Sequence, residues 1–307
     1  MQPIIVVDAG NLLFQKELSV PDRADNAPAL ITARGIVKAY KAMAYDAVAL
    51  STVDLSAGAA FFQQPPAKGL PFVAANVFDK NNNRLVVPHI IKNIPNGSLG
   101  IIGLTGGKAD SSDNFVIVDW RKTLRDEVAA LDKCTMLVVL SSLSKEENDE
   151  LQRDFAQVDI IVTADKKGAA IQPRSSQHSL VVQSGSRGKY IGRLDITRYG
   201  EGNWSIAGPD PLEQPCNELR SIDQQLSQLG EQTQGTGTVL SQTKARLQAK
   251  RQTCLDRIAR QKTETTGNNQ PGKKYQSFFL MVTPIIAEDS VGMIVQEIKA
   301  GIKTSRK

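Results

Sequence analysis

Short apolar runs alternate with longer amphipathic segments along about the first 200 residues of the chain. Continuous apolar runs are typical of strands that are covered on both faces, and apolar positions at steps of three and four indicate helices. Their regular alternation predicts βαβ connections and an α/β fold. We expect strands at 4–8, 46–50, 72–76, 88–94, 99–105, 136–140, 159–165, 179–185 and 190–198, and helices at 31–45, 120–131 and 144–156. Ser144 and Glu147 form the capping-box pattern at the start of the last of these helices.

Residues 209–272 have a different pattern. After a proline-rich break, apolar residues recur at helical steps in two segments that a glycine-containing loop separates, which predicts an antiparallel helical hairpin with narrow apolar seams. A strand at 277–285 and a helix at 287–302 follow. We therefore expect three parts: an α/β domain at 1–208, the hairpin and a loop at 209–272, and a strand and helix at 273–307 that pack back on the first part.

The hairpin carries two of the three cysteines. Cys216 and Cys254 lie equally far from Gly235 in the predicted loop, so they should face each other across an antiparallel helix pair. Adjacent helices allow the Cα separation that a disulfide needs, and we expect this disulfide, which would indicate an oxidising compartment. The alternative is a pair of buried thiols in the seam. Cys134 is expected to be a buried free thiol.

The composition of the chain argues against only a few classes of function. A net charge of +5, with no tract of basic and aromatic residues together, does not indicate nucleic-acid binding. No apolar run is long enough to predict a transmembrane helix. The chain enters a predicted strand directly after its first residues, so we expect any export signal to lie outside this sequence.

Several stretches resemble one family in order and spacing. They are "VVDAGNLLF", "YDAVALSTVDL", "LPFVAANVFDKNNNRLVVPHII", "LGIIGLT", "LVVLSSLSKEENDEL" and "DIIVTAD…VVQSGSRGKYIGRLDI". Together they resemble the N-terminal domain of bacterial periplasmic 5′-nucleotidases, within the calcineurin-like metallophosphoesterases, over roughly residues 3–200. The resemblance implies a four-layer α/β/β/α sandwich, here with an inserted helical hairpin, and a periplasmic or cell-envelope location. It also implies two divalent metal ions at the carboxyl ends of the strands, where they bind phosphate and activate water.

The family's ligand motifs are degenerate in this chain. The first, DxH, should precede the first strand, so either it lies outside this sequence or the protein lacks it. At the other matched positions the chain has Asn11, Thr52, Val53, Ser142, Asp165 and Lys167. Only one of these is a carboxylate, whereas two divalent ions need several anionic or imidazole ligands. We therefore expect no metal cofactor and no catalytic residue.

The basic residues near the last matched positions have two interpretations. Lys166, Lys167 and Arg187 are candidates for binding an anion such as phosphate directly, and the alternative is a solvated loop.

Four other polar residues are expected to be structural. Asp8 should bond to backbone amides at its strand end, and Asp54 should cap the helix that follows it. His89 should be a packed or surface residue in a strand, and His178 should be exposed.

The leading hypothesis is a degenerate 5′-nucleotidase-like domain that acts as a non-catalytic binding or interaction module of the cell envelope. The alternative is an active phosphohydrolase that uses ligands outside the visible motifs. A third hypothesis is a structural protein that self-associates through the hairpin. The partner could accordingly be an envelope protein or a second copy of the chain.

Overall fold

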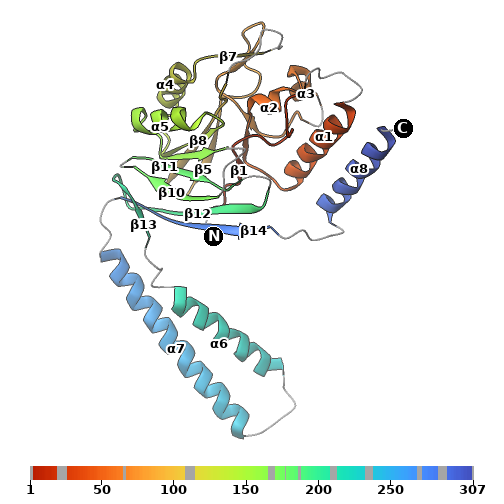
Figure 1. Cartoon of the computed structure of the whole chain (residues 1–307). Coiled ribbons are helices and arrows are strands. Elements are labelled where there is room, and N and C mark those ends of the chain that lie inside the picture. The colour runs from red at the N-terminus through yellow and green to blue at the C-terminus, as the bar shows by residue number, and fades with distance from the viewer. Residues whose placement is uncertain are drawn as a thin grey trace. The chain divides into compact units, whose positions relative to one another are not determined.

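The computed structural model describes residues 3–18, 26–64, 67–107, 115–164, 170–176, 178–185, 188–207, 213–231, 238–267, 272–282 and 289–305. The chain divides into two compact units. The first comprises residues 1–194 and 277–307, and the second comprises residues 195–276. The first unit is an α/β protein with mixed sheets (Figure 1).

A six-stranded sheet forms the centre of the first unit. Its strand order is β10-β11-β9-β8-β6-β5. The four strands β6, β8, β9 and β11 are parallel, and β5 and β10 pair antiparallel at the two edges. The bounds are β5 His89–Ile94, β6 Gly97–Leu104, β8 Met136–Ser141, β9 Ile160–Thr163, β10 Ile171–Ser175 and β11 Leu180–Gln183. Every residue of β8 is buried, as the continuous apolar run predicts.

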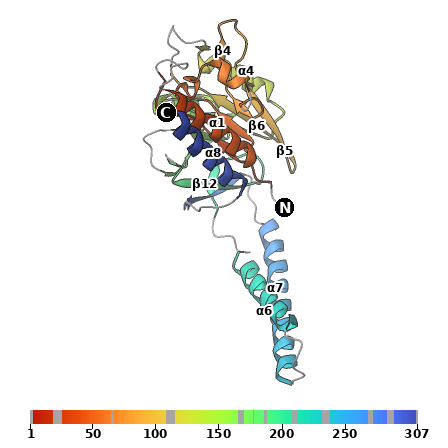
Figure 2. The same ribbon diagram turned by 90° about the vertical axis from the view of Figure 1, so that its right-hand side faces the viewer.

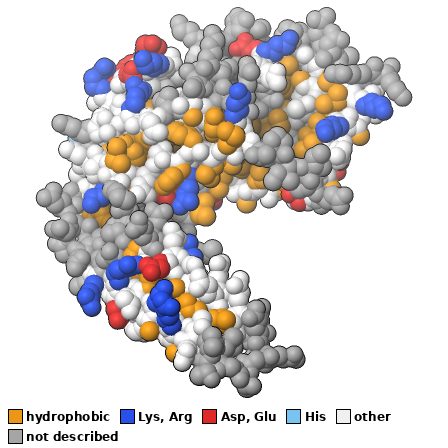
Figure 3. Space-filling model, turned by 60° about the horizontal axis from the view of Figure 1, so that its bottom comes forward, with side chains coloured by type: hydrophobic (Ala, Val, Ile, Leu, Met, Phe, Trp, Pro, Cys, Tyr) orange, Lys and Arg blue, Asp and Glu red, His pale blue; other side chains and the backbone are white. Residues whose placement is uncertain are grey.

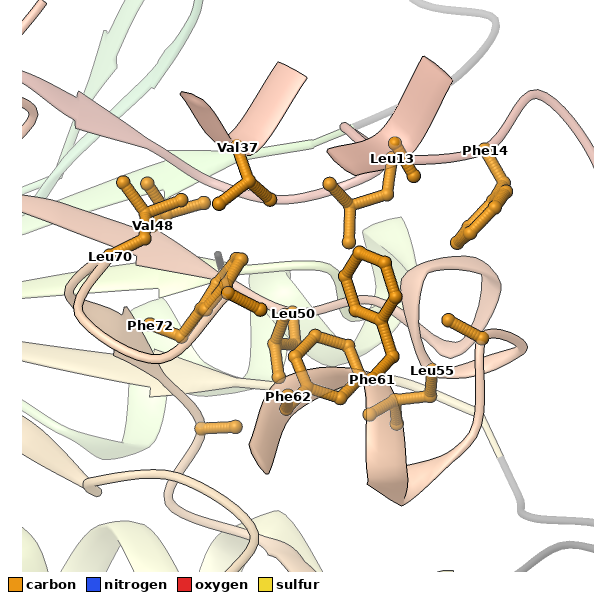
Figure 4. Close-up of a cluster of buried hydrophobic side chains, with 14 of the residues drawn as sticks. Leu13, Phe14, Val37, Val48, Leu50, Leu55, Phe61, Phe62, Leu70 and Phe72 are labelled. Atoms are coloured by element: carbon orange, nitrogen blue, oxygen red, sulfur yellow. The ribbon is translucent and has the colours of Figure 1, made fainter. Parts of the chain in front are cut away.

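A smaller parallel sheet has the order β1-β2-β3. Its strands are β1 Val7–Asp8, β2 Ala47–Ala49 and β3 Phe72–Val73. A separate antiparallel pair joins β4 Val77–Asp79 to β7 Phe115–Ile117. The helices α1 Ala27–Ala42, α2 Thr52–Leu55 and α3 Ala59–Gln63 pack on the small sheet through a buried cluster rich in Phe and Leu side chains (Figure 4).

Two helices cover the six-stranded sheet. Helices α4 Trp120–Ala130 and α5 Lys145–Asp154 bury Leu124 and Leu151 against apolar side chains of β6, β8, β9 and β11. The capping box predicted for α5 is confirmed: the hydroxyl of Ser144 accepts a hydrogen bond from the N–H of Glu147, and the Glu147 carboxylate accepts one from the N–H of Ser144. Helix α8 Ser290–Ser305 lies beside α1, as both ribbon views show (Figure 2), and Lys38 and Glu297 form an ion pair between them.

The first unit also exposes apolar side chains. On strand β14 (Lys273–Met281) and the residue after it, Phe278, Leu280, Met281 and Val282 are all exposed, as are Met293 and Val295 on α8. Figure 3 shows apolar side chains on the face of this unit that carries β14. Within the described residues, no helix is long and apolar enough to cross a membrane.

The second unit contains two long helices, α6 Glu213–Glu231 and α7 Thr238–Gly267. They lie side by side and antiparallel (Figures 1 and 2), and Arg257 pairs with Glu218 while Arg251 pairs with Asp223 across them. A three-stranded sheet has the order β12-β14-β13. Strands β12 Tyr190–Arg198 and β14 begin in one unit and end in the other, and β13 is Trp204–Ile206.

The expected disulfide is wrong. Cys216 and Cys254 are both free thiols. The predicted helix pairing does bring these regions together, but the register places the Cys254 sulfur 3.0 Å from the carbonyl oxygen of Pro215, to which its thiol donates. Cys254 is therefore bonded to the backbone beside Cys216 rather than to its sulfur. Cys134 is free, as expected, although it is only partly buried.

A single glycine sets the spacing between the two sheets of the first unit. A Cβ added to Gly103 of β6 would lie 2.2 Å from the carbonyl oxygen of Val73 in β3, far closer than any real contact. The N–H of Ala75 also donates to the carbonyl oxygen of Gly103 at 2.8 Å. Only glycine fits at this position because backbone, not a flexible side chain, fills the space.

We expect Gly103→Ala to lower the free energy of unfolding by about 3 kcal/mol, because the methyl group forces the two sheets apart. The measurement is urea unfolding followed by circular dichroism. The control is Gly301→Ala in α8, where the added Cβ would meet only the end of the Ile31 side chain at 3.2 Å. Equal effects for the two substitutions would contradict the close approach of the sheets.

Candidate functional site

The loops after β1, β2, β6, β8 and β9 meet at one edge of the two sheets. Hydrogen bonds join them: Asn11 to Ala164, Ser142 to Gly106, and Thr105 to Leu50. Carboxyl ends of parallel strands are where α/β proteins gather functional side chains. This edge is therefore the candidate functional site.

A buried carboxylate connects the loop after β1 to the loop after β2. Asp54 is 0% exposed. Its two oxygens accept hydrogen bonds from the backbone N–H groups of Asn11, Leu12 and Leu13, and from the N–H and hydroxyl of Ser51, at 2.7–2.9 Å. Burial raises the pKa of Asp54, and these bonds act in the opposite direction. Every donor comes from the chain itself, so Asp54 is occupied as a structural acceptor.

The structure refines the expectation for Asp54. It lies inside α2 at the third helical position, where it forms a capping box with Ser51, and Ser51 is the N-cap. Asp54 thus shares the capping of α2 with Ser51. It also accepts three hydrogen bonds from the Asn11–Leu13 backbone, which hold that segment in place.

Asp8 is bonded as predicted, with one partner that the sequence did not reveal. One carboxylate oxygen accepts from the N–H of Gly10 at 2.9 Å, and the other accepts from the hydroxyl of Tyr40 at 2.9 Å. The Tyr40 ring stacks on Tyr45, with ring centroids 4.0 Å apart. Burial raises the pKa of Asp8 above its ordinary value, and the nearby Asp54 carboxylate adds to the rise.

Asn11 is the residue that the sequence resemblance matches to the family's metal-bridging carboxylate. Its backbone is in the left-handed region, with φ of 61°, next to Gly10 at 107°. Asn is one of the few residues that adopt this conformation readily. The side-chain amide nitrogen donates to the carbonyl oxygen of Ala164 at 2.9 Å, which links the β1 loop to the β9 loop.

The other matched positions also make contacts within the protein. The hydroxyl of Ser142 accepts from the N–H of Gly106 at 3.2 Å and lies 3.4 Å from the carbonyl oxygens of Leu50 and Leu104. Val53 is 4% exposed and belongs to the apolar cluster of the small sheet. Thr52 lies against Gly107, where an added Cβ would come within 3.1 Å of its methyl carbon.

Two polar residues of this edge were missed by the sequence analysis. Asn76 is buried, accepts from the N–H of Thr105 at 2.9 Å, and donates to the carbonyl oxygens of Thr105 and Val118. The Thr105 hydroxyl donates to the carbonyl oxygen of Leu50 at 2.7 Å. The signal was available, because each of these residues directly follows an apolar strand run.

The two histidines lie outside this edge's hydrogen-bond network. His89 lies in β5, with Nδ1 2.5 Å from the carboxylate of Glu127, which also pairs with Arg84. The contact between His89 and Glu127 joins β5 to α4. His178 is exposed before β11, as expected. Asp165, Lys166, Lys167 and Arg187 lie outside the described residues.

The part of the donor set that the structure describes does not fit a pair of divalent cations. Among the described residues at matched positions, the side chains are an amide, two hydroxyls and an alkyl group, and divalent-metal sites in proteins need anionic or imidazole ligands. The amide nitrogen of Asn11 donates to the carbonyl oxygen of Ala164, and a neutral amide is a weaker ligand for two cations than a carboxylate. Within the described part of the chain, no group of three His, Cys, Asp or Glu side chains could hold a metal ion.

Comparisons with solved structures identify the fold. The chain matches the calcineurin-like phosphoesterase YfkN from Bacillus subtilis at 14% identity with a TM-score of 0.58, over 99% of this chain and 85% of that one. It matches a 5′-nucleotidase precursor from Thermus thermophilus at 23% identity and a TM-score of 0.50, over 64% of this chain and 42% of that one. It matches the Thermus thermophilus sulfate thiohydrolase SoxB at 15% identity and a TM-score of 0.53, over 63% and 36%.

The resemblance seen in the sequence is thus confirmed at the level of the fold, which is that of calcineurin-like phosphoesterases and 5′-nucleotidases. The chain spans about two fifths of the lengths of the Thermus nucleotidase and SoxB. No family model matches the chain, and no curated protein matches it.

We expect Asn11→Asp to lower the free energy of unfolding by about 1–3 kcal/mol, because it replaces the donor to Ala164 with a carboxylate that faces a carbonyl oxygen. Aspartate tolerates the left-handed backbone, so the effect comes from the lost hydrogen bond and the added negative charge and not from backbone strain. The matched control is Asn96→Asp, at an exposed turn residue with φ of 65°, which should change stability by less than about 0.5 kcal/mol. If Mn²⁺ restored the stability of Asn11→Asp above that of wild type, the site would have retained metal-binding geometry.

The raised pKa of Asp8 predicts a pH-dependent effect of Asp8→Asn. Above the ordinary pKa of 3.8 the unfolded chain releases this proton while the native state keeps it, so wild-type stability falls as pH rises toward the native pKa. The free energy of unfolding of Asp8→Asn does not decrease with pH in this way. The difference between the variant and wild type, variant minus wild type, should therefore increase from pH 4 upward. Urea unfolding at half-unit pH intervals measures the difference.

The control for this experiment is Asp79→Asn. The pKa of Asp79 is lowered by hydrogen bonds from Asn83, so its contribution changes only below the ordinary value of 3.8. Between pH 5 and 8 the difference for Asp79→Asn should be constant. A difference for Asp8→Asn that stays constant from pH 4 upward would show that the native pKa of Asp8 is not raised.

Proposed function

We propose that this protein is a non-catalytic relative of the metallophosphoesterases that serves as a binding or interaction module. The observation that supports this most directly is the hydrogen bond from Asn11 to Ala164. At the position where the family would place a bridging carboxylate, a neutral amide bonds the loop after β1 to the loop after β9. The edge is held together by hydrogen bonds that need no cation.

The other matched positions support the same proposal. Ser142 bonds to backbone of neighbouring loops, and Val53 is part of the apolar core. Restoring a metal site would require breaking several of these contacts at once, because each side chain is already hydrogen-bonded or packed within the protein. A hydrolase lacking both ligands and a transition-state donor would have lost most of its electrostatic catalysis.

We also propose the finer architecture that the resemblance implies. It is a four-layer α/β/β/α sandwich with the α6–α7 pair as an insertion between β13 and β14, and it divides at residues 1–208, 209–272 and 273–307. A periplasmic or cell-envelope location and an anion-binding role for Lys166, Lys167 and Arg187 also stay proposals. The free thiols of Cys216 and Cys254 remove the disulfide as support for the location.

The proposal predicts no hydrolysis. The purified chain, incubated with Mn²⁺ and either p-nitrophenyl phosphate or AMP, should release phosphate no faster than buffer with Mn²⁺ alone. Elemental analysis after dialysis against Mn²⁺ should give well under one equivalent of metal per chain. A functional 5′-nucleotidase at equal concentration serves as the positive control.

The opposite result has a clear meaning. Turnover that depends on bound metal at two equivalents per chain would establish the active phosphohydrolase instead, with ligands that the described residues do not supply.

A further inference from the structure

The charge of this protein is concentrated on one helix. Residues 238–267, which form α7, carry seven basic and two acidic side chains, a net charge of +5. The whole chain also has a net charge of +5, so the remaining residues sum to zero. Outside α7, the numbers of basic and acidic residues are therefore equal, and the net positive charge of the chain equals that of α7.

The neighbouring helix neutralises only part of this charge. On α6, Glu218 pairs with Arg257 and Asp223 pairs with Arg251. These are the acidic side chains of α6 that the structure describes, and both are already engaged. Lys244, Arg246, Lys250 and Arg260 are exposed and form no ion pair within the described residues.

Three of these side chains share one flank of α7 with Arg257. Residues 246, 250, 257 and 260 follow each other at steps of four, seven and three, which places them along one side of an α-helix. At 1.5 Å per residue the row is about 21 Å long. The other residues of this flank between 246 and 260 are Ala249 and Thr253, and one acidic residue, the exposed Asp256, lies at its border four residues before Arg260. We call Arg246, Lys250, Arg257 and Arg260 the basic row. Figure 3 shows Lys and Arg side chains, with acidic and apolar ones among them, on the face of the helix pair that is turned toward the viewer.

The apolar side chains that are buried between the two helices lie outside the basic row. Ile222 on α6 and Cys254 and Ile258 on α7 are buried in the seam. The basic row therefore has no apolar component that would insert into a bilayer or form the core of a protein interface. A second copy of the pair would present the same basic row, so like charges oppose self-association through this face.

We infer that the basic row is a contact surface for an anionic phospholipid bilayer, bound through its headgroups. A row of positive charges along one side of a helix is complementary to a flat array of negative charge. Helix α7 contains no aromatic residue on which the bases of a single-stranded nucleic acid could stack, which argues against that alternative. Because the contact is electrostatic and uses few cations, it is reversible and sensitive to salt. This inference is independent of the proposed loss of catalysis.

The test is co-sedimentation of the full chain with vesicles of phosphatidylcholine containing 30 mol% phosphatidylglycerol, at about 50 mM salt. The variant is the triple substitution Arg246→Gln, Lys250→Gln and Arg260→Gln, which leaves the Arg257–Glu218 pair in place. We expect its vesicle partition coefficient to fall about 100-fold, at about fivefold per basic side chain removed. Wild-type binding should also be abolished at 0.5 M salt and absent on pure phosphatidylcholine.

A charge-matched control separates the basic row from net charge. Lys122→Gln, Lys133→Gln and Lys145→Gln remove three exposed lysines from the first unit and should leave binding within about twofold of wild type. Circular dichroism of both triple variants confirms that they fold. Equal loss in the two triple variants, no binding of wild type to anionic vesicles, or tighter binding to a 20-base-pair DNA duplex at the same salt would each overturn the inference.

Discussion

A single buried carboxylate holds together the edge at which this fold would carry its chemistry. Asp54 accepts five hydrogen bonds from two loops and is fully buried, with burial raising its pKa. A buried acidic group is tolerated only when its oxygens are satisfied, and here the backbone after β1 and the N-cap of α2 supply all the donors. The conformation of the Asn11–Leu13 segment therefore depends on Asp54, and so does the direction in which Asn11 points.

Once that segment is fixed, the remaining contacts follow in sequence. Asn11, in the left-handed backbone after Gly10, reaches Ala164 beyond β9. Ser142 after β8 reaches Gly106 after β6, and Thr105 reaches Leu50 after β2. In a metal-dependent hydrolase the ions themselves would hold such loops together through shared ligands. In this protein, direct hydrogen bonds connect the loops, so the scaffold can persist without ions.

The sequence predicted what depends on local pattern. Strand β12 has the bounds expected from its residues, and the Ser144–Glu147 capping box begins α5 where predicted. The short or irregular elements were missed: β10 contains Pro173 and a register shift at an edge, and β13 has three residues. Edge strands with proline carry little of the apolar alternation by which strands are recognised.

The long-range contacts could not be read in the same way. The Asn11–Ala164 bond joins residues 153 positions apart, and the partner atom is a backbone carbonyl, which leaves no trace in residue type. The Tyr40 hydroxyl bond to Asp8 joins a helix to a strand end. The predicted disulfide failed for a related reason. Equal distance from the loop predicts which residues of two antiparallel helices lie opposite each other only to within about a residue, whereas a disulfide also depends on the direction of the two side chains.

The charge distribution shows how a helix pair can be added to such a scaffold without a new core. Helix α6 uses one narrow seam and two acidic side chains to hold α7, and these satisfy only two of the arginines on α7. Exposed ion pairs of this kind contribute little to stability individually, so the extra cations are not explained by the α6–α7 contact. The folding of the helix pair does not require this excess of positive charge, so the charge is available for binding. In this chain the excess is confined to α7, which lies outside the phosphoesterase-like sheets.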